Sequence, residues 1–163
     1  MVTPALFERF PDAESMGKAE ISEVEELIKT CGLYKTKAKD LVGIGKMLTE
    51  EYGGIVPDTI EELTRLPGVG RKTANLVCGD IYKKAAVVAD THFIRLVNRM
   101  GFVNTKDPLK VENEMRKILP EEKSNDFCHR SVLFGREICT SRRALCELCP
   151  LCDICPKIGV KKK

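Results

Sequence analysis

The feature that most constrains the fold is a recurring pattern of short apolar segments at helical spacing, each bounded by capping or breaking residues. Residues 36–52 carry apolar side chains at this spacing and end before Gly53. Asp107-Pro108 begins a further segment that Pro120 ends. Alternating strand patterns are almost absent. The sequence therefore predicts an all-α fold.

Capping residues predict where several of these helices begin. Ser22 with Glu25, and Asp58 with Glu61, have the spacing of capping boxes. Asp90 stands directly before another apolar segment at helical spacing and is expected to be its N-cap.

A glycine-bearing turn joins two apolar helical segments near the middle of the chain and predicts a helix-hairpin-helix. The pattern consists of Leu63, Leu66, Gly68, Val69, Gly70, Ala74 and Val77. Glycines allow a tight turn, and exposed N–H groups at a helix start attract phosphate. An ordinary helical turn is the alternative. The candidate DNA contacts are Leu66, Gly68, Val69, Gly70 and Arg71.

Composition adds little to this argument. The net charge of +3, from 27 basic and 24 acidic residues, is too small to imply a polyanion partner. A signal peptide and an apolar run of membrane length are both absent, so we expect a cytoplasmic protein without a membrane partner. The basic run 161–163 is expected to be a disordered tail.

Five cysteines near the C-terminus suggest metal ligands, because the chain has no export signal that would favour disulfides. Thiolates at this spacing suit zinc or an iron–sulfur centre. One ligand set is the unbroken C-x2-C run of Cys146, Cys149, Cys152 and Cys155. The other replaces Cys152 with Cys139. Spacing alone leaves both open.

Two stretches together resemble the signature of the endonuclease III family of helix-hairpin-helix DNA glycosylases. They read Leu66-Pro67-Gly68-Val69-Gly70-Arg71-Lys72-Thr73-Ala74-Asn75 and Val88-Ala89-Asp90-Thr91-His92. The resemblance covers nearly the whole chain and implies two helical lobes, 1–84 with the hairpin and 85–163 with a cluster loop. It also implies a monomer that binds double-stranded DNA containing damaged pyrimidines or abasic sites. Such a protein would be nucleoid-associated in a prokaryote.

The family's catalytic pair falls on Lys72 and Asp90. The resemblance implies that Lys72 attacks the sugar C1′, releases the base, forms a Schiff base and cleaves the strand by elimination of the 3′ phosphate. A helix start and Arg71 both disfavour the charged ammonium form of Lys72. Asp90 would stabilise positive charge on the sugar; its plainer role is a helix cap. The lysine favours oxidised pyrimidines as substrate, and His92 receives no catalytic role.

The resemblance also selects the second cysteine set as ligands of a [4Fe-4S] cluster, namely Cys139, Cys146, Cys149 and Cys155. Cys152 is then a bystander, and the cluster is expected to be structural. The short loop between the first two ligands would present Arg142 and Arg143 to phosphates. The remaining cysteines are expected to be buried small apolar residues or spectators: Cys31, Cys78 and Cys128.

The chain departs from the family at its start, where the first two or so helices have no counterpart. That segment normally supplies a glutamine that fills the gap left by the flipped base. The loop 31–34 resembles the family's wedge segment. The missing helices would leave apolar surface that favours self-association. Two rival functions stand beside the enzyme: an inactive DNA-binding remnant in which the missing helices prevent base flipping, and a small iron–sulfur electron-transfer protein built on the cysteine run.

Overall fold

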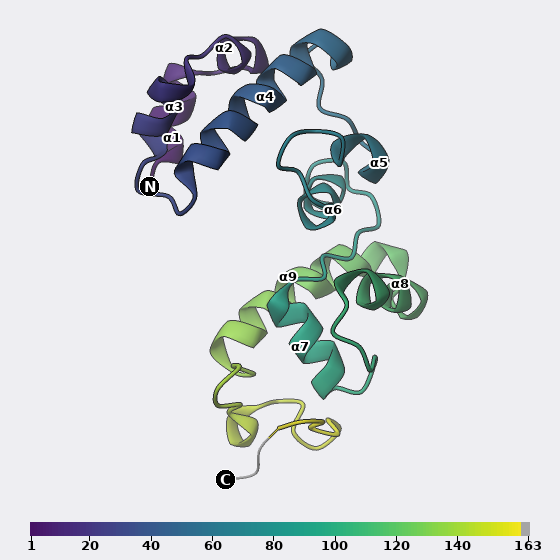
Figure 1. The fold of residues 1–163 in the computed structure, drawn as a ribbon. Coiled ribbons are helices and arrows are strands. Elements are labelled where there is room, and N and C mark those ends of the chain that lie inside the picture. The colour runs from purple at the N-terminus through teal and green to yellow at the C-terminus, as the bar shows by residue number, and fades with distance from the viewer. Residues whose placement is uncertain (161–163) are drawn as a thin grey trace. The chain divides into compact units, whose positions relative to one another are not determined.

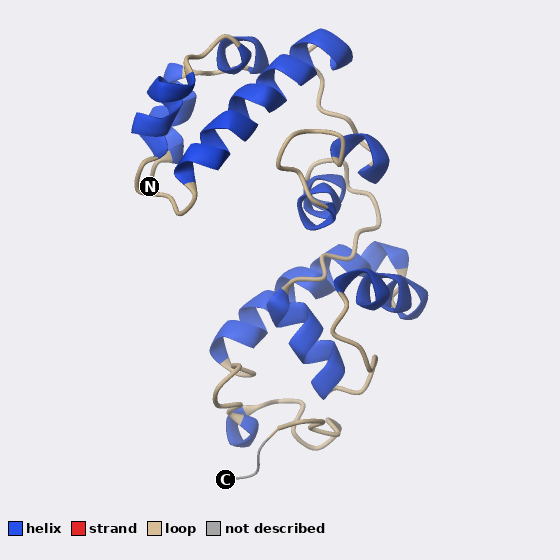
Figure 2. Ribbon diagram, in the orientation of Figure 1, coloured by secondary structure: helices blue, strands red, loops and turns tan. Residues whose placement is uncertain are grey.

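A computed structural model describes residues 1–160, so the basic run 161–163, expected to be disordered, lies outside the described residues. Helices are the regular structure of this part of the chain, apart from one isolated bridge between Cys139 and Ala144 (Figure 2). The helices are α1 Thr3–Arg9, α2 Ala13–Gly17, α3 Ile21–Ile28, α4 Tyr34–Tyr52, α5 Ile60–Leu63, α6 Arg71–Asp80, α7 Thr91–Arg99, α8 Pro108–Ile118, α9 Glu121–Glu137 and the short 3-10 helix η1 Cys146–Leu148. The all-α prediction is confirmed. None of the described helices is long and apolar enough to cross a membrane.

Several predicted helix boundaries are confirmed by their hydrogen bonds. Asp90 caps α7, because its side chain accepts from the N–H of Phe93 at 2.8 Å. Asp107 caps α8 in the same way, with Pro108 in the first turn. The last helical residue of α4 is Tyr52, and Gly53 follows with a left-handed φ of 59°.

The two predicted capping boxes are wrong. Helix α3 begins one residue before Ser22, which therefore lies inside the first turn, and its N-cap Glu20 makes no side-chain cap. Helix α5 is capped by Thr59 rather than Asp58, because Thr59 has the extended backbone of an N-cap and accepts from Glu62 N. The cap therefore lies one residue later than predicted, and Thr59 Oγ1 also donates to Glu62 Oε2 at 2.9 Å.

The chain divides into two compact units, Met1–Ala74 and Asn75–Lys163, with the boundary inside α6. In the first unit α2 and α3 pack on the long helix α4, and α1 packs on α3 (Figure 1). Its core consists of Leu6, Phe10, Met16, Val24, Ile28, Ala38 and Val42. Gly45 of α4 lies directly against α2, where an added Cβ would meet Gly17 N at 2.5 Å. The predicted lobe bounds, 1–84 and 85–163, stay a prediction.

The second unit is organised around α7 and α9, which pack together (Figure 1). Phe93 is fully buried and meets Phe127 edge-on, with ring centroids 6.0 Å apart. The core of the unit is formed by Val87, Val88, Phe93, Val97, Val103, Val111, Met115 and Cys128. This core fixes the N-terminal end of α7, where Asp90 stands.

Candidate functional site

The predicted hairpin is present as α5, a tight turn and α6. Leu63 and Leu66 are buried and hold the hairpin together. Val69 N–H donates to Leu66 O at 3.1 Å, and Ala74 N–H donates to Gly70 O at 3.0 Å, which starts α6. Leu66 as a whole is only 4% exposed, and its N–H donates to Leu63 O, so this predicted DNA contact lies inside the hairpin.

The exposed side of the turn presents hydrogen-bond donors. Gly68 and Gly70 are exposed, and among residues 1–160 neither N–H group has a hydrogen-bond partner. Gly68 has a φ of 68°, which L residues rarely adopt. Arg71 is exposed at the first position of α6, and Val69 is half-buried. Unpaired donors at the start of a helix are a site for an anion such as phosphate.

Helix α4 supports this turn from behind. A Cβ added at Gly43 would lie 3.0 Å from the Pro67 ring. A Cβ added at Gly68 would meet the Asp40 carboxyl group, with Asp40 Cγ at 2.7 Å. The turn therefore rests closely on the middle of α4. Sequence reasoning did not find Asp40, because its contact joins segments distant along the chain.

Lys72 lies in the first turn of α6 and is exposed. The same helix is anchored one turn later, where Asn75 is 1% exposed and its Oδ1 accepts from Arg116 Nη2 at 2.7 Å. Arg116 also pairs with the buried Glu112 at 3.2 Å. An exposed amine thus stands on a helix whose next turn is fixed.

Asp90 is positioned by its own cap and by the segment before it. Its Oδ1 accepts from Phe93 N, which leaves Oδ2 available to another group. The preceding extended segment is held by two side chains of α9: Ala86 N–H donates to Ser124 Oγ at 3.2 Å, and Val88 N–H donates to Cys128 Sγ at 3.3 Å. Cys128 is therefore an acceptor that positions Asp90, not a spectator. Burial raises the pKa of its thiol to about 11.

Two arginines of α7, one helical turn apart, hold the start of the cysteine loop. Arg95 donates to Cys139 O at 3.1 Å and to Gly135 O at 2.7 Å, and it also contacts His92 Nδ1 at 3.2 Å. Arg99 donates to Cys139 Sγ at 3.2 Å and to Thr140 O at 2.8 Å. The only sequence pattern that could have predicted this shared role is the spacing of four residues, which places the two arginines on the same side of α7.

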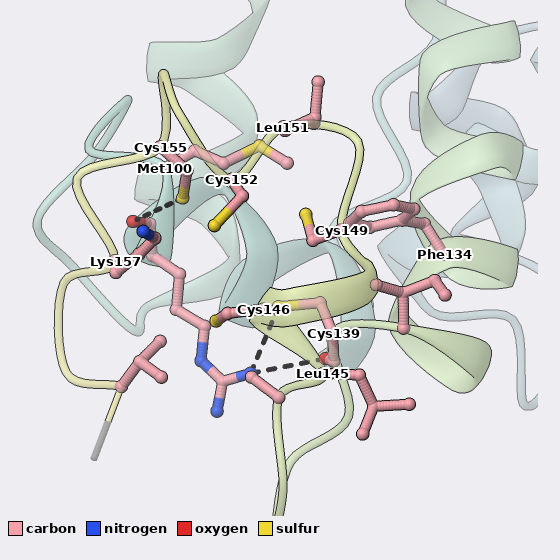
Figure 3. Close-up of a pocket in the computed structure, with 14 residues that line it drawn as sticks. Met100, Phe134, Cys139, Leu145, Cys146, Cys149, Leu151, Cys152, Cys155 and Lys157 are labelled. Carbon is pink, nitrogen blue, oxygen red and sulfur yellow. Dashed lines mark hydrogen bonds between the residues drawn. The ribbon is translucent and has the colours of Figure 1, made fainter. Parts of the chain in front are cut away.

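Five cysteines line one hollow at this end of the second unit, and Figure 3 shows their sulfur atoms around a shared space. The other walls of the hollow are mostly apolar, among them Phe134 and Leu145. Among the described residues, no three cysteine, histidine or acidic side chains are arranged to hold a single metal ion. All eight cysteines are free of disulfides.

The electrostatic surroundings of these cysteines differ. Burial raises the pKa of Cys149, and the thiols of Cys155, Cys139 and Cys146 add to the rise. Cys152 interacts with Lys157, whose pKa is raised first by a hydrogen bond to the Cys152 side chain and also by Cys146 and Cys155.

The loop between the first two predicted ligands is tightly held. Cys139 and Ala144 form the isolated bridge, and Leu145 N–H donates to Ile138 O at 2.9 Å. Thr140 Oγ1 donates to Arg143 O at 2.5 Å across the loop. Arg142 and Arg143 lie exposed at its tip. Their guanidinium groups are thus presented on a constrained backbone.

Comparison with known proteins decides the family. Residues 1–121 match the model of the HhH-GPD superfamily base excision DNA repair proteins. The chain belongs to the HhH-GPD superfamily. This HhH-GPD chain is 44% identical over 144 residues to Endonuclease III of Thermotoga maritima, an alignment that covers 88% of the chain and 68% of that relative. It is 40% identical over 156 residues to Endonuclease III of Synechocystis, covering 95% of the chain and 71% of that relative.

A solved structure agrees with these relatives. The HhH-GPD chain superposes on a trapped endonuclease III–DNA covalent intermediate with a TM-score of 0.89 and 38% identity, covering 96% of the chain and 74% of that structure. The resemblance to endonuclease III is confirmed, and with it the prediction of a base-excision repair enzyme of the DNA glycosylase and AP lyase kind. The two rival functions are not favoured.

Proposed function

We propose that this chain removes oxidised pyrimidines from double-stranded DNA and then cleaves the abasic strand, using Lys72 as nucleophile and Asp90 as its carboxylate partner. The observation that carries this proposal is the pair of anchored positions: an exposed lysine in the first turn after the hairpin, and an aspartate held at the start of α7. The likeness to a covalent endonuclease III–DNA intermediate supports a nucleophile in this fold.

Lys72 would supply the covalent step. After the damaged nucleotide leaves the stack, the neutral amine attacks C1′ and the base departs with the electron pair of the glycosidic bond. Ring opening gives a Schiff base between Lys72 and C1′. Loss of a C2′ proton then expels the 3′ phosphate by β-elimination, and water releases the lysine from the cleaved product.

Asp90 would act through the carboxylate oxygen that its cap does not use. Oδ1 accepts from Phe93 N, so Oδ2 is the atom that can face positive charge developing on the sugar. Hydrogen bonds from Ala86 and Val88 to α9 hold the segment that leads to Asp90. The carboxylate is therefore presented on a rigid support, as a stabilising charge requires.

Borohydride trapping tests the proposal. Reduction of the Schiff base should link the wild-type chain to a duplex carrying an oxidised pyrimidine, and Lys72→Ala should abolish that adduct. Trapping that survives this substitution overturns the assignment. Because neighbouring Arg71 is also exposed and cationic, Arg71→Gln is the matched control for loss of charge alone.

Asp90→Asn separates the cap from the chemistry. Asparagine also caps helices well, so the unfolding free energy should change by less than about 0.5 kcal/mol. Loss of the carboxylate charge should lower the rate of base release by about 100-fold or more. An unchanged rate would show that Asp90 is only a helix cap.

We also propose that Cys139, Cys146, Cys149 and Cys155 hold a [4Fe-4S] cluster. The fit is supported by the hollow, which their sulfurs line with mainly apolar neighbours. Such a cluster would crosslink four thiolates and so fix the loop that presents Arg142 and Arg143 to DNA phosphates. Cys152, which is hydrogen-bonded to Lys157, is left out of the set because the resemblance to the family's cluster loop leaves it out.

Two serine substitutions test the ligand set. Cys152→Ser should keep the visible iron–sulfur absorption and the iron content, whereas Cys139→Ser should lose both. The reverse result would show that Cys152, not Cys139, is the fourth ligand.

We propose that the cluster-loaded protein acts as a monomer on duplex DNA. It would be cytoplasmic, and nucleoid-associated where the host is prokaryotic.

A further inference from the structure

Three lysines of α4 form a row on one side of the helix. Lys35, Lys39 and Lys46 are separated by four and seven residues, a spacing that aligns side chains along a helix. All three are exposed, and within residues 1–160 none of them forms an ion pair. We call these three residues the α4 lysine row.

The row runs beside the hairpin turn. Lys39 immediately precedes Asp40, which contacts Gly68, and Lys46 follows Gly43, which contacts Pro67, by three residues. The middle of α4 thus carries the turn on one side and two lysines next to it. The exposed N–H groups of the turn and the ammonium groups of the row belong to one unit of the chain.

The length of the row fits an extended polyanion. Eleven residues separate Lys35 from Lys46, or about 16 Å along an α-helix. Phosphates along one DNA strand advance by about 3.4 Å each, so the row spans about five of them. Lysine side chains are flexible point charges, suited to backbone contacts that do not depend on sequence.

We propose that the α4 lysine row is a second phosphate-binding track for duplex DNA, continuous with the hairpin turn. The inference rests on the proposed function, because it takes DNA as the partner. It adds a surface that neither the hairpin nor Lys72 requires. Its consequence is that part of the affinity of this chain for undamaged duplex depends on α4 and is lost with added salt.

The test measures binding of the full cluster-loaded chain to a fluorescently labelled undamaged duplex at several salt concentrations. The variant is Lys35→Gln/Lys39→Gln/Lys46→Gln. The matched control is Lys37→Gln, because Lys37 is an exposed lysine of the same helix, two residues from Lys35 and from Lys39, and therefore on the opposite side. Far-UV circular dichroism checks that both variants keep the helical fold.

Each phosphate contact contributes about 0.9 to the slope of log binding constant against log salt concentration. The triple variant should therefore lose about 2.7 from that slope. The ratio of wild-type to variant affinity should fall by about 40-fold between about 50 and 200 mM salt. Lys37→Gln should leave the slope unchanged.

Two results overturn the inference. One is a triple variant with the wild-type slope. The other is a Lys37→Gln slope reduced by about 0.9, which would show that any lost charge has the same effect. Borohydride trapping distinguishes failure of the proposed function from failure of the lysine row. A wild type that neither traps nor binds duplex defeats the proposed function as well, whereas Lys72-dependent trapping with an unaffected triple-variant slope defeats the lysine row alone.

Discussion

Substitution of Gly68 by alanine is expected to distort the hairpin turn by two separable effects. The residue has a φ of 68°, a left-handed conformation that costs an L residue about 1–2 kcal/mol. The added Cβ would also meet the Asp40 carboxyl group, with Asp40 Cγ at 2.7 Å and Asp40 Cβ at 3.0 Å. Moving the Asp40 side chain off its preferred rotamer costs about 0.5–1.5 kcal/mol. Together we expect a loss of about 2–3 kcal/mol from the unfolding free energy.

Gly70→Ala is the matched control within the same turn. Gly70 does not have a left-handed φ, and no atom lies within 4 Å of its added Cβ. Its stability should therefore stay within about 0.5 kcal/mol of the wild type. DNA binding should still weaken, because the new methyl group would stand on the exposed side of the turn where a phosphate would approach.

Urea unfolding followed by far-UV circular dichroism measures these differences in stability, and fluorescence anisotropy measures duplex affinity. The double variant Asp40→Ala/Gly68→Ala should recover the part of the loss that comes from the Asp40 contact, but not the part that comes from φ. Equal stabilities of Gly68→Ala and Gly70→Ala would refute the reasoning. So would a double variant less stable than the sum of its single substitutions predicts.

Three further predictions follow from packing and charge. Burial raises the Cys128 pKa to about 11 from 9.0, so the folded state keeps the thiol protonated while the unfolded state ionises. Wild-type unfolding free energy should then fall by about 2 kcal/mol as pH rises from 9 to 11, and Cys128→Ser should lack this part of the fall. Gly45→Ala places a Cβ 2.5 Å from Gly17 N and 2.7 Å from Ala13 O, and should cost about 1–3 kcal/mol in thermal unfolding. Gly32→Ala should cost no stability, because the space around its added Cβ is open. Equal melting temperatures of Gly45→Ala and Gly32→Ala would contradict the close approach of α2 and α4. Asp40→Asn removes a negative charge beside the turn and should raise duplex affinity at low salt; weaker binding would show that the carboxylate supports the turn instead.

Local patterns in the sequence predicted most of the helices, because capping residues and breakers act within a few positions. Asp90, Asp107 and Gly53 each lie at the helix end expected of them. The two predicted capping boxes were wrong for different reasons: α3 begins at Ile21 without a side-chain cap, whereas at α5 two neighbouring residues satisfy the same local rule. At α5 both Asp58 and Thr59 can cap, and only the backbone conformation decides between them.

The candidate site shows the same contrast between what local sequence patterns predict and what only the folded chain decides. The sequence by itself determined the family, the hairpin and the candidate pair Lys72 and Asp90, because a signature of adjacent residues carries them. Only the tertiary structure revealed what holds them: Asp40 behind Gly68, Cys128 behind the segment before Asp90, and Arg99 on the Cys139 sulfur. These contacts join residues distant along the chain. No local spacing encodes such contacts, because they depend on how whole helices pack.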